Sequence, residues 1–401
     1  MKISTRIIFL TAAAVFTLLT GDALGFGKNK VRYQPMSWEQ LHAPHYTLYY
    51  HQEQGELPEI SYRLLNEIYK DLSGRFEFVH GSKVPVVIYE SSALFEQTNI
   101  ITELLPEEVG GFTEFFKNRV VMPFNGSLND FRHVLHHEMV HAFVFGMVYG
   151  GRTLFRTPVQ VPLWFNEGLA EVLSNGWNKE ADMFMIDRII NSSIAPPGPY
   201  LNGYMAYKGG QSFLYYLYST EGDSLFNLML RNFKSGKNAE KAIRRVYKKD
   251  LDELGKEWIL ELRRVYWPEA GLRMNPSENA LEVTNSVKEK SHVNIRPKIS
   301  PDGSLIAFYS DKKDYTRIII RDTKSNKEIR QIGQHGLGIG ETVESFQPFN
   351  GGMCWSPDGS ALAFTAKRGG RNEIRLVDVK RGKNRRTIKL ALSAINSLDW
   401  S

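Results

Sequence analysis

Cysteine is nearly absent from this sequence: Cys354 is the only one in 401 residues. A single cysteine excludes an intrachain disulfide, so packing, a bound metal or both must hold the fold together. Hydrophobic residues make up 42% of the chain and charged residues 23%, which is typical of a globular rather than a disordered protein. The length exceeds that of one ordinary core and predicts two or three domains.

Beyond its start, the sequence also lacks any segment long and apolar enough to cross a bilayer. The start has basic residues at Lys2 and Arg6, an apolar run over 7–20, and small residues at 23–25. These features in this order predict a secretory signal peptide over residues 1–25. We therefore expect an exported protein, periplasmic or extracellular, with no transmembrane segment after the signal peptide. An uncleaved N-terminal anchor is the alternative.

Signatures of nucleic-acid-binding folds are missing too, although the formal charge is +6. Much of the basic excess lies between Lys367 and Lys389, where ten Lys or Arg residues accompany two acids. Such a run is able to meet an acidic partner, but on strands and turns it more often decorates a solvated surface. We expect no nucleic-acid partner.

Residues 26 to about 275 have the pattern of mixed α/β structure. Apolar alternation and short β-branched runs predict strands at 45–51, 84–89 and 119–122. Helical spacing and helix-end signals predict helices at 60–72, 128–146 and 162–174, and a mostly helical stretch over 207–267 with Gly222, Gly236 and Gly255 as punctuation.

Residues 137–141 read His-Glu-Met-Val-His, inside the helix expected at 128–146. His137 and His141 are four residues apart, so both imidazoles lie on one face and can bind one ion. Glu138 lies on a neighbouring part of that face, where its carboxylate can reach a water on the metal without being a ligand. The alternative is an ordinary buried helix with two hydrogen-bonded histidines.

A second acidic pair follows in residues 162–171, which read PLWFNEGLAE. Glu167 and Glu171 are again four apart on one helical face, among apolar side chains that argue against a solvated acidic surface. Zinc needs a third protein ligand and an open fourth position. We therefore expect one Zn²⁺ per chain, bound by His137, His141 and Glu167, because a His/His/Glu set favours zinc. Glu171 is expected to accept a hydrogen bond from the His137 imidazole.

The segments HEMVH and WFNEGLAE together resemble the gluzincin metallopeptidases, the clan of thermolysin and the M1-type aminopeptidases. The resemblance covers about residues 40–270. It implies a zincin-like α+β domain, a small mixed sheet plus helices, over residues 26–275. It also implies hydrolysis of a peptide or protein substrate, with Glu138 as general base. No aminopeptidase-type Gly-x-Met-Glu-Asn segment precedes the helix, so an endopeptidase is favoured and another exopeptidase is the alternative.

Two further segments extend this resemblance. Residues 207–217, YKGGQSFLYYL, look like the Tyr-x-Lys-Gly helix of the aminopeptidases, in which the tyrosine stabilises the oxyanion. The matching residue is Tyr207, and Tyr204 is a competitor. Residues 110–112 and the strand at 119–122 resemble the edge strand that pairs with extended substrates in this clan. The additional helix residues His133 and His136 are assigned as structural or surface histidines.

The composition changes near Pro276, and the remaining sequence has short strands, turns and an internal repeat. Ser-Pro-Asp-Gly-Ser occurs at 300–304 and again at 356–360, each time before an apolar strand. The repeat resembles the WD40-type propeller repeats of TolB, which carry a Trp-Ser-Pro-Asp-Gly turn in each blade. About two repeats and the start of a third at 395–401 predict an incomplete all-β propeller over residues 276–401, and the front part of a longer protein.

The sequence thus predicts an exported zinc-dependent peptidase whose propeller gathers substrate or docks a protein partner. The alternative is a propeller-based binding or scaffold protein with a structural or latent zinc domain. Glu138 separates the two hypotheses, because a purely structural zinc site has no need of a carboxylate at that position.

Overall fold

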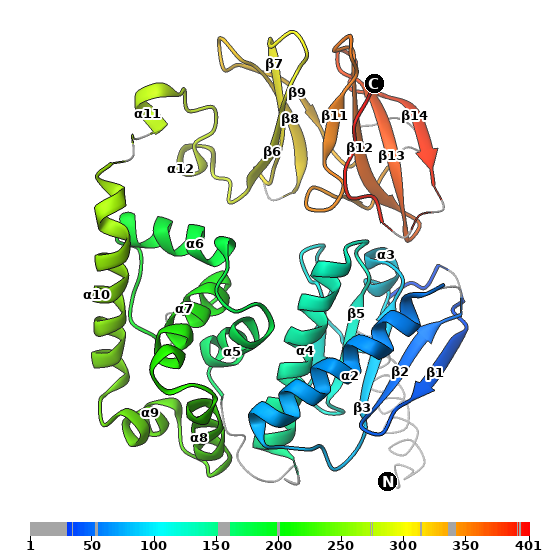
Figure 1. Ribbon diagram of the computed structural model, residues 1–401. Coiled ribbons are helices and arrows are strands. Elements are labelled where there is room, and N and C mark those ends of the chain that lie inside the picture. Colours follow the sequence, from blue (N-terminus) through cyan, green and yellow to red (C-terminus); the bar gives the residue numbers. More distant parts are fainter. Residues whose placement is uncertain are drawn as a thin grey trace, which may run out of the picture.

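The structure is a computed structural model (Figure 1). It describes residues 30–33, 35–52, 55–150, 161–198, 201–272, 274, 276–312, 315–335, 342–390, 392 and 394–401. The expected signal peptide, residues 1–25, lies outside the described residues. In the part of the chain that is described, no helix combines the length and the apolar character that a membrane crossing requires.

The first part of the chain forms a mixed sheet of five strands in the order β1-β2-β3-β5-β4. Strands β2, β3 and β5 run parallel, whereas β1 and β4 are antiparallel edge strands. The bounds are β1 Trp38–His42, β2 Tyr46–His51, β3 Val84–Tyr89, β4 Phe112–Glu114 and β5 Arg119–Pro123. The predicted strands at 45–51, 84–89 and 119–122 are confirmed within one residue.

Both faces of this sheet are covered, which explains why β3 is apolar at nearly every position. Val86 and Ile88 belong to the large core formed with helices α2 (Leu57–Phe76) and α4 (Leu128–Tyr149). Val87 and Tyr89 belong to a smaller core on the other face, beside the short helix α3 (Ser92–Phe95). The sheet therefore provides a rigid base on which α4 lies.

Helix α4 begins where the sequence predicts but continues past Gly146 to Tyr149. Its first turn is capped by the Ser127 hydroxyl, which accepts a hydrogen bond from the Asp130 backbone N–H at 3.3 Å. Gly146 does not end the helix. A Cβ at this residue would lie 2.8 Å from the His80 ring, so the glycine allows that ring to pack closely.

The helices after α4 complete the large core; they are α5 Leu163–Asn175, α6 Lys179–Ile190, α7 Tyr204–Glu221, α8 Asp223–Lys234, α9 Ala239–Tyr247 and α10 Leu251–Ala270. Gly222 and Gly236 punctuate this stretch as predicted, but the same prediction for Gly255 is wrong, since this residue lies inside α10. A Cβ on Gly255 would lie 2.6 Å from Pro196 and Pro197. Close helix packing, rather than a helix end, accounts for the glycine.

Helices α5 and α7 cross at a pair of glycines. A Cβ on Gly210 would lie 2.2 Å from the Trp164 carbonyl oxygen, and a Cβ on Gly168 would lie 2.4 Å from the Gly210 carbonyl carbon. No side chain larger than hydrogen fits at either position without moving a backbone. The two helices can therefore approach closely enough for residues near the start of α7 to contact the acidic face of α5.

We expect Gly210→Ala to destabilise the protein by about 2 kcal/mol or more, because overpacking at this crossing outweighs the small gain in helix propensity. The measurement is the free energy of unfolding in urea. Gly74→Ala is the matched control, since Gly74 lies in α2 and its added Cβ would meet nothing within 4 Å. Equal stability of Gly210→Ala and the wild type would show that the close crossing is not required.

The last part of the chain forms two antiparallel sheets that pack against each other. The first contains β6 Asn294–Ile299, β7 Leu305–Ser310, β8 Arg317–Asp322 and β9 Glu328–Ile332. The second contains β10 Ser345–Phe346, β11 Met353–Trp355, β12 Ala361–Arg368, β13 Arg371–Asp378 and β14 Asn384–Lys389. A propeller needs at least four such sheets around a central channel, and the described residues contain two. The fold is therefore α+β with several small sheets, and a propeller is not shown.

The sequence repeat forms the same turn twice. Ser300 donates from its hydroxyl to Asp302 at 2.6 Å, and Ser356 donates to Asp358 at 2.6 Å. In each turn the fourth residue is a glycine with positive φ, +74° at Gly303 and +68° at Gly359. The predicted tight turns are confirmed, whereas 395–401, expected to begin a third repeat, contain no helix or strand.

The sheet formed by β10–β14 lies beside helix α3 of the first part of the chain (Figure 1). The Lys367 ammonium pairs with Glu96, and the Asn350 backbone N–H donates to Glu107 Oε1 at 2.8 Å. Lys367 belongs to the basic run of 367–389, and within the same run Arg375 pairs with Glu373 and Arg385 with Asp378. Part of the basic excess is therefore neutralised inside the fold.

Candidate metal centre

Helices α4 and α5 bring four of the predicted site residues together. The side chains of His137, His141 and Glu167 converge in a buried position, with relative exposures of 8%, 6% and 7%. The i, i+4 spacing places both imidazoles on the face of α4 that meets α5. Glu171, one turn beyond Glu167 on α5, lies behind His137.

One donor atom from each of His137, His141 and Glu167 forms a corner of an almost equilateral triangle. His137 Nε2 lies 3.1 Å from His141 Nε2, and each of these atoms lies 3.3 Å from Glu167 Oε2. In a tetrahedral zinc site with bonds of about 2.0 Å, ligand atoms lie about 3.3 Å apart. The triangle thus has the size that a zinc ion requires, and a His/His/Glu donor set is one that zinc accepts.

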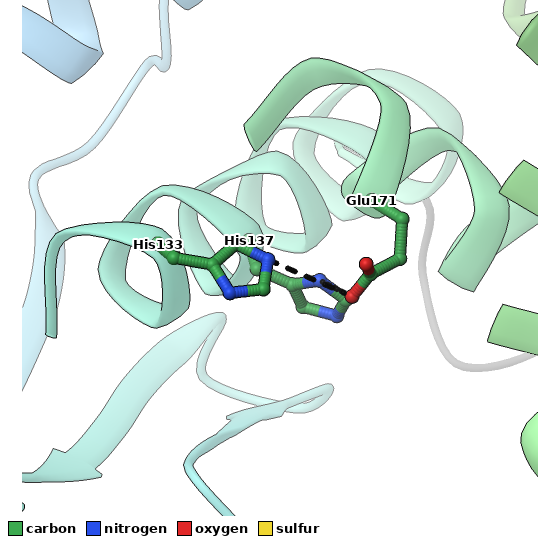
Figure 2. A group of neighbouring side chains, drawn as sticks. All are labelled: His133, His137 and Glu171. Carbon is green, nitrogen blue, oxygen red and sulfur yellow. Dashed lines mark ion pairs between the residues drawn. The ribbon is translucent and has the colours of Figure 1, made fainter. Parts of the chain in front are cut away.

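Glu171 defines which nitrogen of His137 faces the triangle. Its Oε1 lies 3.2 Å from His137 Nδ1, and this contact is one of the ion pairs that Figure 2 marks with dashed lines. A proton on Nδ1 that is donated to Glu171 leaves the lone pair of Nε2 free for a metal. The predicted contact between Glu171 and His137 is present in the structure.

The electrostatics of the cluster favour a positive charge at this point. Burial opposes the charged form of the His137 imidazole, but hydrogen bonds to Glu167 and Glu171 outweigh it and raise the pKa of His137 to about 10. Burial would also raise the pKa of both carboxyls, but the histidines hold the pKa of Glu167 well below its usual range, and His137 and Lys208 lower that of Glu171 to about 2. Ionised carboxylates beside imidazoles suit a bound cation.

A second group, His133 with His137 and Glu171, also has donor atoms close enough to bind an ion (Figure 2). This group shares His137 and Glu171 with the first one. His133 Nε2 lies 3.7 Å from Glu171 Oε1, and the Lys208 ammonium occupies the other oxygen of that carboxylate at 2.8 Å. A cation in the second group would meet this ammonium, so the triangle with His141 and Glu167 is the better metal centre.

Glu138 is held beside the triangle by strand β4. The Thr113 hydroxyl lies 2.8 Å from Glu138 Oε2 and 2.9 Å from the Glu138 carbonyl oxygen. A Cβ on Gly111 would lie 3.2 Å from the Glu138 side chain, so this glycine lets β4 approach the helix. The carboxylate is therefore oriented by a hydrogen bond without being one of the three converging donors.

The structure separates the two candidate tyrosines. The Tyr207 ring is nearly parallel to that of His137, with a centroid separation of 6.1 Å, and burial together with the charges of Glu167 and Glu138 raises the pKa of its phenol. Tyr204 is half exposed, and its hydroxyl donates to Glu180 instead. Tyr207 is thus the tyrosine that lies against the candidate metal centre.

Two expectations from the sequence need correction or addition. The strand at 119–122 is not an edge strand, because β5 lies between β3 and β4, and β4 forms that edge of the sheet. Thr113 belongs to no motif, and Lys208 lies in the segment that resembles the Tyr-x-Lys-Gly helix, where the sequence assigned it no role. The fold brings Thr113 to Glu138 and Lys208 to Glu171. His136 lies 3.9 Å from Asp71 on the other side of α4, in keeping with its structural assignment.

A cavity of about 480 Å³ lies near Glu138. Its walls include Gly110 and Val134, beside Glu138, and Glu180 at the start of α6. Phe349 and Asn350, from the loop after β10, line its other side. The last part of the chain therefore contributes to the wall of a cavity that passes one helical turn from Glu138, whereas the predicted metal ligands do not line it.

The partial structural likenesses to known proteins include a zinc metallopeptidase and a TolB. The crystal structure of a mutant M1 zinc metallopeptidase from Deinococcus radiodurans is 14% identical over 56% of this chain and 52% of its own, with a TM-score of 0.32. The crystal structure of TolB from Acinetobacter baumannii is 24% identical over 25% of this chain and 21% of its own, with a TM-score of 0.18. No family model and no curated protein matches the sequence.

Proposed function

We propose that this chain is a zinc-dependent peptidase that binds one Zn²⁺ through His137, His141 and Glu167. The observation that carries this proposal is the buried triangle of three donor atoms, 3.1 to 3.3 Å apart, with the Glu138 carboxylate held next to it. A zinc site that serves only structure is closed by a fourth protein ligand. Here three donors converge, and the neighbouring carboxylate is restrained by Thr113 outside the triangle.

Zinc, when bound, lowers the pKa of a coordinated water and polarises the substrate carbonyl. The residues of the chain supply the remaining functions. Glu138 takes the proton of the attacking water and passes it to the leaving amine. Tyr207 keeps its phenolic proton and donates a hydrogen bond to the oxygen that becomes negative. Glu171 holds the His137 ring in the tautomer that presents Nε2.

The β4 edge is the proposed binding place for the substrate backbone. Among the described residues, β4 has a strand neighbour on one side only. A peptide added to the other side would run past Thr113 and therefore past Glu138. Recognition through main-chain hydrogen bonds suits an endopeptidase acting on unfolded or extended segments, and the adjoining cavity has room for substrate side chains.

The proposal extends to the organisation of the protein. We place the peptidase unit in residues 26–275 and a TolB-like propeller unit, present in part, in residues 276–401. Separate hydrophobic cores on either side of residue 276 support this division. The sequence pattern of residues 1–25 supports export, and the propeller-like unit would gather substrate or bind a protein partner.

The test of this function is zinc content and casein cleavage, measured on the purified wild type and on Glu138→Gln. We expect about one zinc per chain in both proteins and cleavage by the wild type alone. One zinc per chain without cleavage by the wild type would instead support the scaffold hypothesis, in which the zinc domain is structural or latent. Absence of zinc from the wild type would refute the metal site itself.

Tyr207→Phe is expected to lower kcat by about 10²-fold, because an oxyanion donor is lost while the metal ligands stay in place. Zinc content and KM should change little. Tyr204→Phe is the matched control and should remain close to the wild type, since its hydroxyl contacts Glu180 rather than the cluster. If Tyr204→Phe proved the more damaging of the two, the assignment of Tyr207 would be wrong.

A further inference from the structure

Lys208 is an unusually buried lysine. It lies on α7 directly after Tyr207, and only 3% of it is exposed. Its ammonium lies 2.8 Å from Glu171 Oε2 on α5 and 3.6 Å from Glu180 Oε2 on α6. Burying an ammonium is unfavourable unless a carboxylate compensates it, so this position in the fold depends on Glu171.

Lys208 and His137 use different oxygens of the same carboxylate. Glu171 Oε2 accepts from Lys208, while Oε1 faces His137 Nδ1 at 3.2 Å. Two contacts on opposite oxygens restrict the rotation of a carboxylate, which one contact alone does not. His133 also approaches this carboxylate, but its Nε2 is farther away, at 3.7 Å from Oε1. The phenols of Tyr204 and Tyr207 are close enough to interact electrostatically with Glu171 as well.

We propose that Lys208 is a positioning residue for the metal centre: it orients Glu171 so that this carboxylate holds the His137 ring with Nε2 toward the zinc. The inference rests on the proposed zinc site and adds to it a residue outside the ligand motifs. Lys208 acts through Glu171 and touches neither metal nor substrate. The same contact ties the helix that carries Tyr207 to the helix that carries Glu167.

If Lys208 acted only through its charge, removing it would change the zinc affinity in the opposite direction from that expected if it positions Glu171. As a bare charge, the ammonium repels Zn²⁺, so its removal would tighten zinc binding. As the residue that orients Glu171, its removal loosens the His137 ring and weakens zinc binding. Partners of metal ligands typically change metal affinity 10–100-fold when they are mutated.

The experiment is the zinc dissociation constant of the full chain, measured with Zn²⁺ against a chromophoric competing chelator, for Lys208→Met, Glu171→Gln and the double variant. We expect Lys208→Met to weaken binding on the order of 10-fold. In the Glu171→Gln background the same change should cause no further weakening beyond about 2-fold, since the residue through which it acts is gone. Lys249→Met is the control, because Lys249 forms a half-exposed ion pair with Glu257 far from α4 in the chain.

Zinc binding by Lys208→Met that equals or exceeds that of the wild type would overturn the proposal, as would losses that multiply in the double variant. Thermal unfolding of the metal-free proteins checks that each variant is folded. If Lys208→Met does not fold, Lys208→Gln replaces it, because its amide is neutral but still able to hydrogen bond, and the same weakening is expected. A wild type that binds no zinc would refute the zinc site and with it the role of Lys208, whereas the outcomes above overturn the role of Lys208 alone.

Discussion

Replacing Glu138 by glutamine should abolish casein cleavage while leaving one zinc per chain in place. The loss should reach about 10²- to 10⁴-fold in kcat, the usual contribution of a general base. Glutamine has nearly the same shape but cannot accept the proton of the attacking water. Zinc is retained because Glu138 is not among the three converging donors.

The environment of Glu138 makes this substitution structurally mild. The Thr113 hydroxyl already lies within hydrogen-bonding distance of both the Glu138 side chain and its backbone carbonyl. It can donate to that carbonyl and accept from the new amide, so no buried group loses its partner. Zinc content by metal analysis and kcat on casein are measured together, with Glu240→Gln on the exposed face of α9 as control. Full activity in Glu138→Gln would exclude its role as general base.

The local part of the site was predictable because helix geometry alone determines it. Spacing of four residues places His137 with His141, and Glu167 with Glu171, on single helical faces. In the structure these two helical faces meet, and His137, His141 and Glu167 converge there. The strands of the first sheet were predictable for a similar reason, since buried β-branched runs between turn residues have few other solutions.

Contacts that depend on how helices cross were not predictable. Gly168 and Gly210 carry no signal that they meet, although their meeting brings Lys208 to Glu171. A glycine often ends a helix, but Gly255 lies inside α10, where Pro196 and Pro197 leave no room for a Cβ. The order β3-β5-β4 likewise cannot be derived from strand periodicity, which is the same for a central strand and an edge strand.

Glu167→Ala is expected to lose most of the zinc that the wild type binds. Glu167 is the only carboxylate among the three converging donors, so the substitution leaves two imidazole donors and removes the negative charge that balances the cation. The weakening should exceed the 10–100-fold that partners of ligands typically cost. Glu240→Ala serves as control, since Glu240 forms an exposed ion pair with Arg244 on α9.

Thermal unfolding with and without added zinc gives a second measurement that needs no substrate. A metal that binds only the folded state stabilises it by about 2.7 kcal/mol when its free concentration is 100 times the dissociation constant. The wild type should therefore show a rise in Tm with zinc, and Glu167→Ala should show little or none at the same concentration. An equal rise in both proteins would mean that zinc binds elsewhere, and Glu167 would then have to be removed from the ligand set.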